Sequence, residues 1–181
     1  VAGPLMKGMK HIPVDRAAGG AAYRRAVAAL RDGEIVGVYP EATISRAFEL
    51  KDFKVGAARM ARDAGVPIIP CVIWGAQRVW TKDHPKRMGR TNTPIYVDLG
   101  APIDVSAEAN PHEVTAQLKE TMAAMLEGLW DTYPPVPADE QIFVPRSRGG
   151  LAPTLEEAAE LYKAELARKA ASLIVVEYDV L

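Results

Sequence analysis

Short unbroken apolar runs are the first regular feature of this chain. Three of them, at 34–39, 66–74 and 94–99, are rich in Val and Ile and are bounded by Gly, Pro or charged residues. Runs of this length and composition are typical of buried strands. Pro67 and Pro70 lie near the start of the second run, where a missing backbone N–H is tolerated. The pattern therefore predicts three strands, of which the first two are expected to be buried.

Apolar positions at helical spacing occur before the first run, between the first two runs and after the third. They predict helices over 17–32, 53–64 and 111–130. Gly33 and Gly65 follow the first two helices at the position where a left-handed residue ends a helix. Because strands and helices alternate along the chain, we expect an α/β layered domain over 1–132.

The last third of the chain changes in composition. Residues 133–153 are rich in Pro and Gly and predict a linker or a surface arm. Residues 154–181 predict a C-terminal helix and tail, since Thr154 and Glu157 have the spacing of a capping box. The β-branched residues within 172–181 favour either an edge strand or a docking tail.

Composition and charge exclude several classes of function. The 181 residues have a formal net charge of -1, so no overall basic field argues for a nucleic-acid partner. Three scattered His and one Cys show no metal-ligand spacing. That cysteine, Cys71, lies in an apolar run and is predicted to be a small buried hydrophobe. No apolar stretch is long enough for a membrane-spanning helix.

Polar residues of several kinds gather directly after the first apolar run. Glu41, Thr43, Ser45 and Arg46 follow Pro40 within six positions. In open α/β sheets, sites form beyond the carboxyl ends of the strands, and these four side chains are placed there by the predicted strand. The alternative is a polar turn that only solvates a loop.

Three motifs occur in an order that resembles a known family. They are I-P-V-D-R at 12–16, Y-P-E-A-T-I-S-R at 39–46 followed by F-K-V-G-A-A at 53–58, and V-P-I-I-P at 66–70. They resemble the second, third and fourth blocks of the lysophospholipid acyltransferase family, which includes the 1-acylglycerol-3-phosphate acyltransferases. The resemblance implies a mixed, largely parallel sheet flanked by helices.

The resemblance also implies an activity. Members of this family transfer a fatty acyl group from acyl-CoA or acyl carrier protein to the hydroxyl of a lysophospholipid such as 1-acylglycerol-3-phosphate, with no further cofactor. It implies work at the cytoplasmic face of a membrane, as a peripheral protein or one anchored by an N-terminal segment. Two alternatives stay open: a glycolipid acceptor, and a catalytically incompetent subunit that binds lipid or a protein partner through 133–181.

The family's site residues carry over to six positions of this chain. On this resemblance Arg16 and Arg46 hold the acceptor phosphate, and Glu41 and Thr43 order the acceptor or its loop. The full predicted substrate-binding set is Arg16, Glu41, Thr43, Ser45, Arg46 and Lys54. Lys54, near a predicted helix N-terminus, would add positive charge.

The chain departs from the family at two places. Ile44 and Ala42 stand where the third block has Arg and Gly, so Arg46 is expected to replace the missing guanidinium. The catalytic signature H-x-x-x-x-D is absent, since His11 is followed by Asp15, one position too close. We expect this signature upstream of Val1, and no catalytic residue is assigned within the chain.

A basic segment with two tryptophans lies between the second and third apolar runs. Residues 78–90 carry five Lys or Arg, with Trp80 inside the segment and Trp74 just before it. Such a segment favours contact with anionic lipid headgroups at a membrane surface. The alternative is a solvated loop with one tryptophan in the core.

Overall fold

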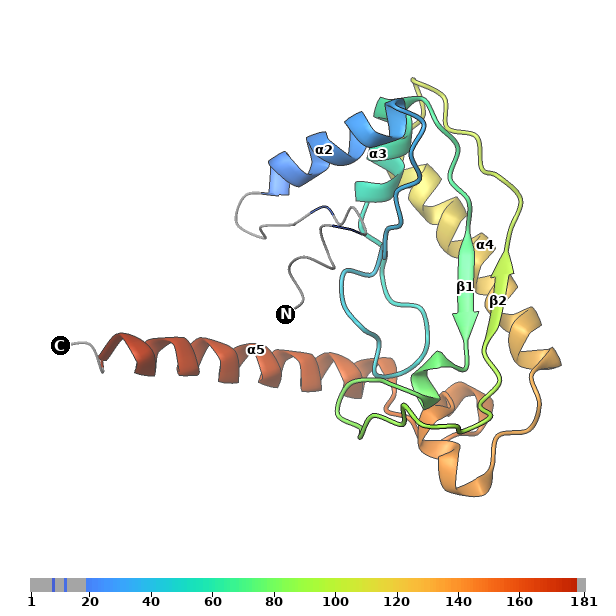
Figure 1. Ribbon diagram of the computed structural model, residues 1–181, viewed down its shortest axis with the longest axis vertical. Coiled ribbons are helices and arrows are strands. Elements are labelled where there is room, and N and C mark those ends of the chain that lie inside the picture. Colours follow the sequence, from blue (N-terminus) through green and yellow to red (C-terminus); the bar gives the residue numbers. More distant parts are fainter. Residues whose placement is uncertain (1–7, 9–11, 13–18, 179–181) are drawn as a thin grey trace. The chain divides into compact units, whose positions relative to one another are not determined.

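The computed structural model describes Gly8, Ile12 and residues 19–178 (Figure 1). Its helices and strands run in the order α2, α3, β1, β2, α4 and α5, with three short 3-10 helices among them. The longer elements are α2 (Gly19–Arg31), α3 (Gly56–Ala64), β1 (Cys71–Trp74), β2 (Tyr96–Leu99), α4 (Pro111–Thr132) and α5 (Leu155–Tyr178). The 3-10 helices are η1 (Ala76–Arg78), η2 (Ala138–Phe143) and η3 (Arg146–Arg148).

The chain divides into two compact units. The first unit comprises 1–42, 52–72 and 99–125, and the second comprises 43–51, 73–98 and 126–181. Each unit is therefore built from three separate stretches of sequence, and the loop after residue 39 contributes to both.

The first unit has a small aliphatic core. Ala58 and Ala61 of α3 pack with Val105 and Val114, and Ile68 packs against this cluster. Helix α2 lies on α3, where Tyr23 donates a hydrogen bond from its hydroxyl to Asp63 Oδ2 at 2.6 Å. Small residues at the centre of α3 let the neighbouring elements approach closely, because alanine adds only one methyl group to the helix surface.

The second unit is built around aromatic residues. Trp74, at the end of β1, is 5 % exposed and meets the rings of Trp130 and Tyr133 edge-on at centroid distances of 5.5 and 6.3 Å. Tyr96 packs on Tyr133 in the same way at 5.1 Å. Edge-to-face pairs are favoured because the positive edge of one ring meets the negative face of the other.

The sheet differs from the prediction. It has two strands, β1 and β2, and their arrows point in opposite directions in Figure 1. An antiparallel bridge between Ile68 and Ile103 continues the pairing outside the named strands. A largely parallel sheet is therefore not present in the part of the chain that the structure describes. The second and third predicted strands are confirmed in shortened form.

The first predicted strand is wrong for the described structure. Residues 34–39 form no strand, and Ile35 and Tyr39 are 96 % and 88 % exposed. An apolar run becomes a buried strand only when another strand pairs with its backbone and another layer covers its side chains. Neither condition is met for this run among the described residues.

The prediction that Cys71 is buried is also wrong, since Cys71 is exposed. Side chains alternate along β1: Val72 and Trp74 are buried, whereas Cys71 and Ile73 point to the opposite, exposed face. Because successive strand residues point to opposite faces, Cys71 could be buried only if both faces of β1 were covered.

The predicted helices are confirmed, with local differences at their ends. Helix α3 begins at Gly56 rather than at residue 53, and it ends at Gly65, which is left-handed with φ 71°. Asn110 Oδ1 accepts from the backbone N–H of His112 at 3.0 Å before α4. Each end is fixed by a local backbone or side-chain hydrogen bond.

Helix α5 is longer than predicted. Its capping box is formed, because the Thr154 N–H donates to Glu157 Oε2 at 2.8 Å and the Glu157 N–H donates to Thr154 Oγ1 at 3.2 Å. The helix then continues to Tyr178, so the strand or tail expected over 172–181 is helical as far as residue 178. The remainder of that stretch lies outside the described residues.

The Pro-rich residues 133–153 fold as an arm with two 3-10 helices, η2 and η3. None of the helices in the described part of the chain has a segment long and apolar enough to cross a membrane. Among the same residues, His, Cys, Asp and Glu form no group of three suited to a metal ion.

Candidate functional site

The loop that follows residues 34–39 is tightly turned. The Ala42 N–H donates to the Tyr39 carbonyl at 3.2 Å, and the Lys54 N–H donates to the Pro40 carbonyl at 2.9 Å. Ala42 and Phe48 have positive φ angles of 61° and 57°, a conformation that side chains other than glycine rarely adopt. The loop therefore holds a strained backbone at the position where the resembling family has glycine.

Arg46 is the most buried of the predicted site residues, at 8 % exposed. Its Nε donates to Asp83 Oδ2, and its Nη2 donates to Glu165 Oε2 at 2.9 Å. The hydrogen bond from Arg46 holds the pKa of Asp83 below its usual range. A buried guanidinium needs such partners, because an isolated buried charge is strongly unfavourable.

Glu165 of α5 receives hydrogen bonds from three cationic side chains. Lys169 Nζ donates to its Oε1 at 2.7 Å, and Lys82 Nζ donates to its Oε2 at 2.5 Å, the oxygen that Arg46 also contacts. The Glu165 side chain is 13 % exposed. These hydrogen bonds, that of Lys169 first, hold the pKa of Glu165 far below its usual range, so this group is a carboxylate.

Two further predicted residues lie in the same unit as Arg46. Thr43 Oγ1 accepts a hydrogen bond from Lys51 Nζ. Lys51 Nζ also lies 5.4 Å from the centre of the Tyr162 ring on α5. Ser45 Oγ is buried and has no hydrogen-bond partner among the described residues. The loop 43–51 thus presents a guanidinium, an ammonium and two hydroxyl groups to its own unit.

The structure places the six predicted site residues in different parts of the chain. Thr43, Ser45 and Arg46 belong to the second unit, whereas Glu41 and Lys54 belong to the first. Arg16 lies outside the described residues. The residues that bind Arg46 were not in the predicted set. Lys82 and Asp83 occur in the basic segment that the sequence singled out, but Glu165, 119 positions from Arg46, gives no sequence signal.

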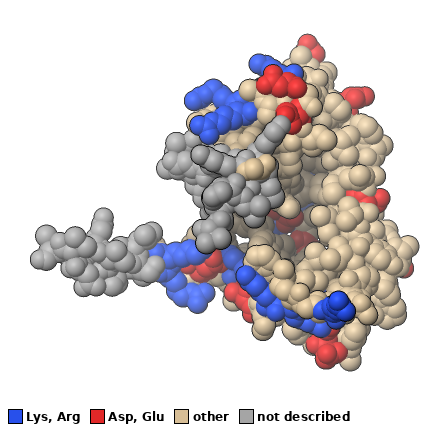
Figure 2. Space-filling model, in the orientation of Figure 1, with Lys and Arg blue, Asp and Glu red and all other residues tan. Residues whose placement is uncertain are grey.

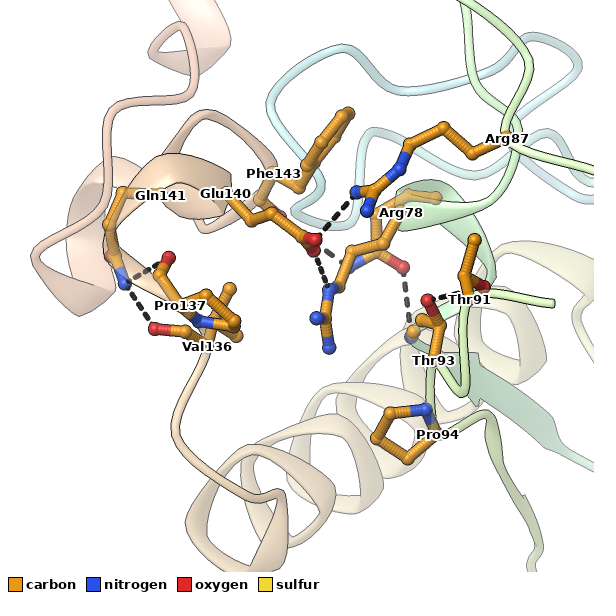
Figure 3. Close-up of polar contacts among 12 residues, drawn as sticks. Arg78, Arg87, Thr91, Thr93, Pro94, Val136, Pro137, Glu140, Gln141 and Phe143 are labelled. Atoms are coloured by element: carbon orange, nitrogen blue, oxygen red, sulfur yellow. Dashed lines mark hydrogen bonds and ion pairs between the residues drawn. The ribbon is translucent and has the colours of Figure 1, made fainter. Parts of the chain in front are cut away.

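The basic segment 78–90 is partly used to hold the second unit together (Figure 3). Arg78 is 6 % exposed, and its Nε donates to Glu140 Oε2 at 2.6 Å while its Nη1 donates to the Tyr133 hydroxyl at 2.9 Å. Arg87 Nη1 lies 2.6 Å from Glu140 Oε1, so both oxygens of Glu140 are engaged. We define these residues, Arg78, Arg87 and Glu140, as the Glu140 cluster.

Another part of the basic segment, around Trp80 and at 86–90, faces outward. Trp80 and Met88 are 58 % and 69 % exposed, and Lys86 Nζ lies 4.1 Å from the centre of the Trp80 ring. Trp74 is buried, so the predicted alternative with one tryptophan in the core describes Trp74 and not Trp80. The segment therefore combines a structural half with an exposed aromatic and basic half.

Charged side chains of both signs lie together along the described part of α5 in Figure 2. Around Glu165 the cations are Arg46, Lys82 and Lys169, and the other anion is Asp83. We call these five residues the Arg46 cluster. Chemically, it is a place where one carboxylate is held by one guanidinium and two ammonium groups, a set of donors that also suits a phosphate.

Comparison with known proteins agrees with the motifs. Residues 1–74 match the family model described as "Acyltransferase". A 1-acyl-sn-glycerol-3-phosphate acyltransferase of Borreliella burgdorferi is 26 % identical over 109 residues, which are 59 % of this chain and 42 % of that protein.

A solved structure is also similar. The crystal structure of the 1-acyl-sn-glycerophosphate (LPA) acyltransferase PlsC from Thermotoga maritima matches with a TM-score of 0.54 and 26 % identity, covering 63 % of this chain and 46 % of that one. This chain therefore spans less than half the length of both relatives. The predicted resemblance is confirmed: residues 1–74 match the acyltransferase family model, and the chain is similar to 1-acyl-sn-glycerol-3-phosphate acyltransferases over part of its length.

Proposed function

We propose that this chain forms the acceptor-binding part of an acyltransferase that transfers a fatty acyl group from an acyl thioester to the hydroxyl of a lysophospholipid. The acyl donor is acyl-CoA or acyl carrier protein, and the acceptor carries a phosphate, as in 1-acylglycerol-3-phosphate. The relatives named for this activity support the reaction class.

One observation carries the proposal: Arg46 and Lys82 donate to the same carboxylate oxygen, from different segments of one unit. A planar guanidinium and a nearby ammonium are the groups that hold phosphate oxygens, because several donors can then share one doubly charged anion. Arg46 lies in the motif that resembles the third family block, two positions after Ile44, which stands where that block has arginine.

The chemical step sets a limit on the role of these residues. Attack by the acceptor hydroxyl on the thioester needs a general base, and the family uses the histidine of H-x-x-x-x-D for it. These 181 residues contain no such signature, and the described side chains offer no histidine–carboxylate pair with that spacing. We therefore assign acceptor binding to this chain. A lipid-binding subunit without its own catalysis is the second candidate, supported by the exposed Trp80 and Lys86 of the basic segment.

Binding of a short-chain lysophosphatidate, measured by isothermal titration calorimetry, tests the acceptor site. Replacing Arg46 by Ala removes a charge-assisted contact and should weaken binding about tenfold or more, whereas Arg46→Lys should weaken it less. Arg90→Ala, at an exposed arginine of the basic segment, is the matched control and should bind as the parent does. A monoacylglycerol without phosphate should bind poorly to every variant.

The result that refutes the site is equal affinity of the parent and Arg46→Ala for lysophosphatidate, with unchanged circular dichroism spectra. Release of the CoA thiol from acyl-CoA, followed with a thiol reagent in the full-length protein as its source produces it, then separates the two candidates. Release that depends on lysophosphatidate supports the enzyme, and binding without release supports the non-catalytic subunit.

We also propose that the exposed half of the basic segment contacts an anionic membrane surface on the cytoplasmic side. Such a contact uses exposed apolar and cationic groups. The apolar groups here are Trp80 and Met88, and the cation is Lys86. Co-sedimentation with vesicles containing phosphatidylserine should fall for Trp80→Ala and should be weak with phosphatidylcholine. Equal sedimentation of the parent and Trp80→Ala would refute this contact.

A further inference from the structure

Helix α5 places one face against the cations of the Arg46 cluster. Tyr162, Glu165 and Lys169 are spaced by three and four residues, so they share a face of the helix. Lys82 Nζ lies 5.9 Å from the centre of the Tyr162 ring and 2.5 Å from Glu165 Oε2. One turn of α5 therefore contacts the same lysine through an aromatic ring and through a carboxylate.

The carboxylate of Glu165 lies where an anionic ligand would bind. Its Oε2 accepts from both Arg46 and Lys82, and its Oε1 accepts from Lys169. A carboxylate and a phosphate use the same donors, and the phosphate offers one more oxygen and more charge. Two anions cannot share these donors at full strength, because like charges at this separation repel.

The described contacts of α5 are mainly polar. Leu161 and Leu166 are each 45 % exposed, and Leu155 is 43 % exposed, so none of these three leucines is a core residue. Ala158 is the one residue of the helix in the described buried apolar set. Segments held by few buried apolar contacts open at low free-energy cost, and ligands that compete for their polar contacts displace them.

We propose that Glu165 is an internal occupant of the acceptor's phosphate site, so that α5 is an autoinhibitory element released by a phosphate monoester. This inference rests on the proposed function, since it takes Arg46 as a phosphate ligand. In the closed state Glu165 holds Arg46 and Lys82. In the open state the phosphate takes both cations, and the carboxylate of Glu165 returns to water beside Lys169.

Titration with glycerol 3-phosphate, a soluble phosphate monoester, tests the competition. Glu165→Gln and Glu165→Ala remove the internal anion. The apparent dissociation constant for glycerol 3-phosphate should then fall about tenfold or more, because the protein no longer has to open before the phosphate can bind. Glu160→Gln is the matched control, because Glu160 lies on α5 and is paired with Lys163 at 2.6 Å. It should bind as the parent does.

Hydrogen–deuterium exchange of the α5 backbone gives a second readout, because a merely structural role of Glu165 would not make the exchange rate of the parent depend on the ligand. Because coupling between two sites is reciprocal, glycerol 3-phosphate should speed exchange over 155–170 in the parent. In Glu165→Ala exchange over this range should already be fast and should not respond to the ligand. A Glu165 that only stabilises the helix would give faster exchange without tighter ligand binding.

The combined outcomes separate this inference from the proposed function. If Glu165→Ala binds glycerol 3-phosphate more tightly than the parent, and Arg46→Ala/Glu165→Ala loses this gain, the result supports both the autoinhibitory role and the phosphate site. Weaker binding by Arg46→Ala together with unchanged or weaker binding by Glu165→Ala overturns the autoinhibitory role and leaves the phosphate site standing. If neither the parent nor Glu165→Ala binds glycerol 3-phosphate or lysophosphatidate, the phosphate site is wrong and the autoinhibitory role is wrong with it.

Discussion

Replacing Glu140 by Gln should strongly destabilise the second unit. The Glu140 side chain is 10 % exposed, and its two oxygens engage Arg78 and Arg87 at 2.6 Å each. The amide of glutamine is neutral, and half of it is a hydrogen-bond donor that would face an arginine donor. The substitution therefore leaves a buried guanidinium without its counter-charge.

The expected loss of unfolding free energy in Glu140→Gln follows from the different burial of Arg78 and Arg87. Arg87 is 37 % exposed along its side chain, so it can turn into water at little cost. Arg78 is 7 % exposed along its side chain and keeps only its hydrogen bond to Tyr133. Removing one member of a buried ion pair costs about 3–5 kcal/mol, and we expect about 3 kcal/mol because Tyr133 remains.

Urea unfolding followed by tryptophan fluorescence measures this loss in the appropriate unit. All three tryptophans, at 74, 80 and 130, lie in the second unit. With a slope of about 2 kcal/mol per molar urea, a loss of about 3 kcal/mol lowers the midpoint by about 1.5 M. Asp139→Asn, at the exposed neighbouring carboxylate, is the control and should change stability by less than about 0.5 kcal/mol.

A double variant separates loss of charge balance from loss of packing. Arg78→Met/Glu140→Leu removes both buried charges, so it should recover to within about 1 kcal/mol of the parent. If Glu140→Gln alone loses less than about 1 kcal/mol, the Glu140 cluster contributes little and the reasoning fails. If the double variant is less stable than Glu140→Gln, packing and not charge explains the loss.

Protonation of Glu140 at low pH should destabilise the second unit as Glu140→Gln does. Burial by itself would raise the pKa of Glu140, but the hydrogen bonds from Arg78 and Arg87 outweigh it, and the pKa is lowered. A lowered pKa in the folded state contributes stability above the unfolded pKa of about 4.3, and that stability is lost as pH falls through the folded value. The free-energy difference between the parent and Glu140→Gln should therefore shrink between pH 5 and pH 3.

Two backbone predictions use glycine as the probe. Ala42→Gly should raise the unfolding free energy measured by far-UV circular dichroism by about 0.5–1 kcal/mol, because the φ of 61° strains alanine. Ala28→Gly, within α2, should lower it by a similar amount, and two changes of the same sign would contradict this account. Gly75→Ala should lower the stability read by tryptophan fluorescence by about 3 kcal/mol, since φ is 97° and an added Cβ would overlap the Pro94 carbonyl. Gly89→Ala, where a Cβ meets nothing, should be nearly neutral, and an equal loss there would refute the steric explanation.

The sequence by itself determined the helices and several of their ends. The capping box of Thr154 and Glu157 and the left-handed Gly65 form as predicted, and Asn110 caps the predicted helix α4. Each depends on hydrogen bonds within about four residues, so the information is local. The family motifs are likewise contiguous, and the match of residues 1–74 to the acyltransferase family model agrees with the resemblance that they indicate.

Tertiary structure decided what surrounds the predicted site. The apolar run 34–39 has the composition of a strand, yet its burial depends on partners that no local pattern specifies, and Ile35 is 96 % exposed. Arg46 was predicted to bind an anion, but the anions that it meets are Asp83, 37 positions away, and Glu165, 119 positions away. Local propensity acts over a few residues, whereas a charge buried on folding takes whichever counter-charge the packing of distant segments brings within hydrogen-bond distance.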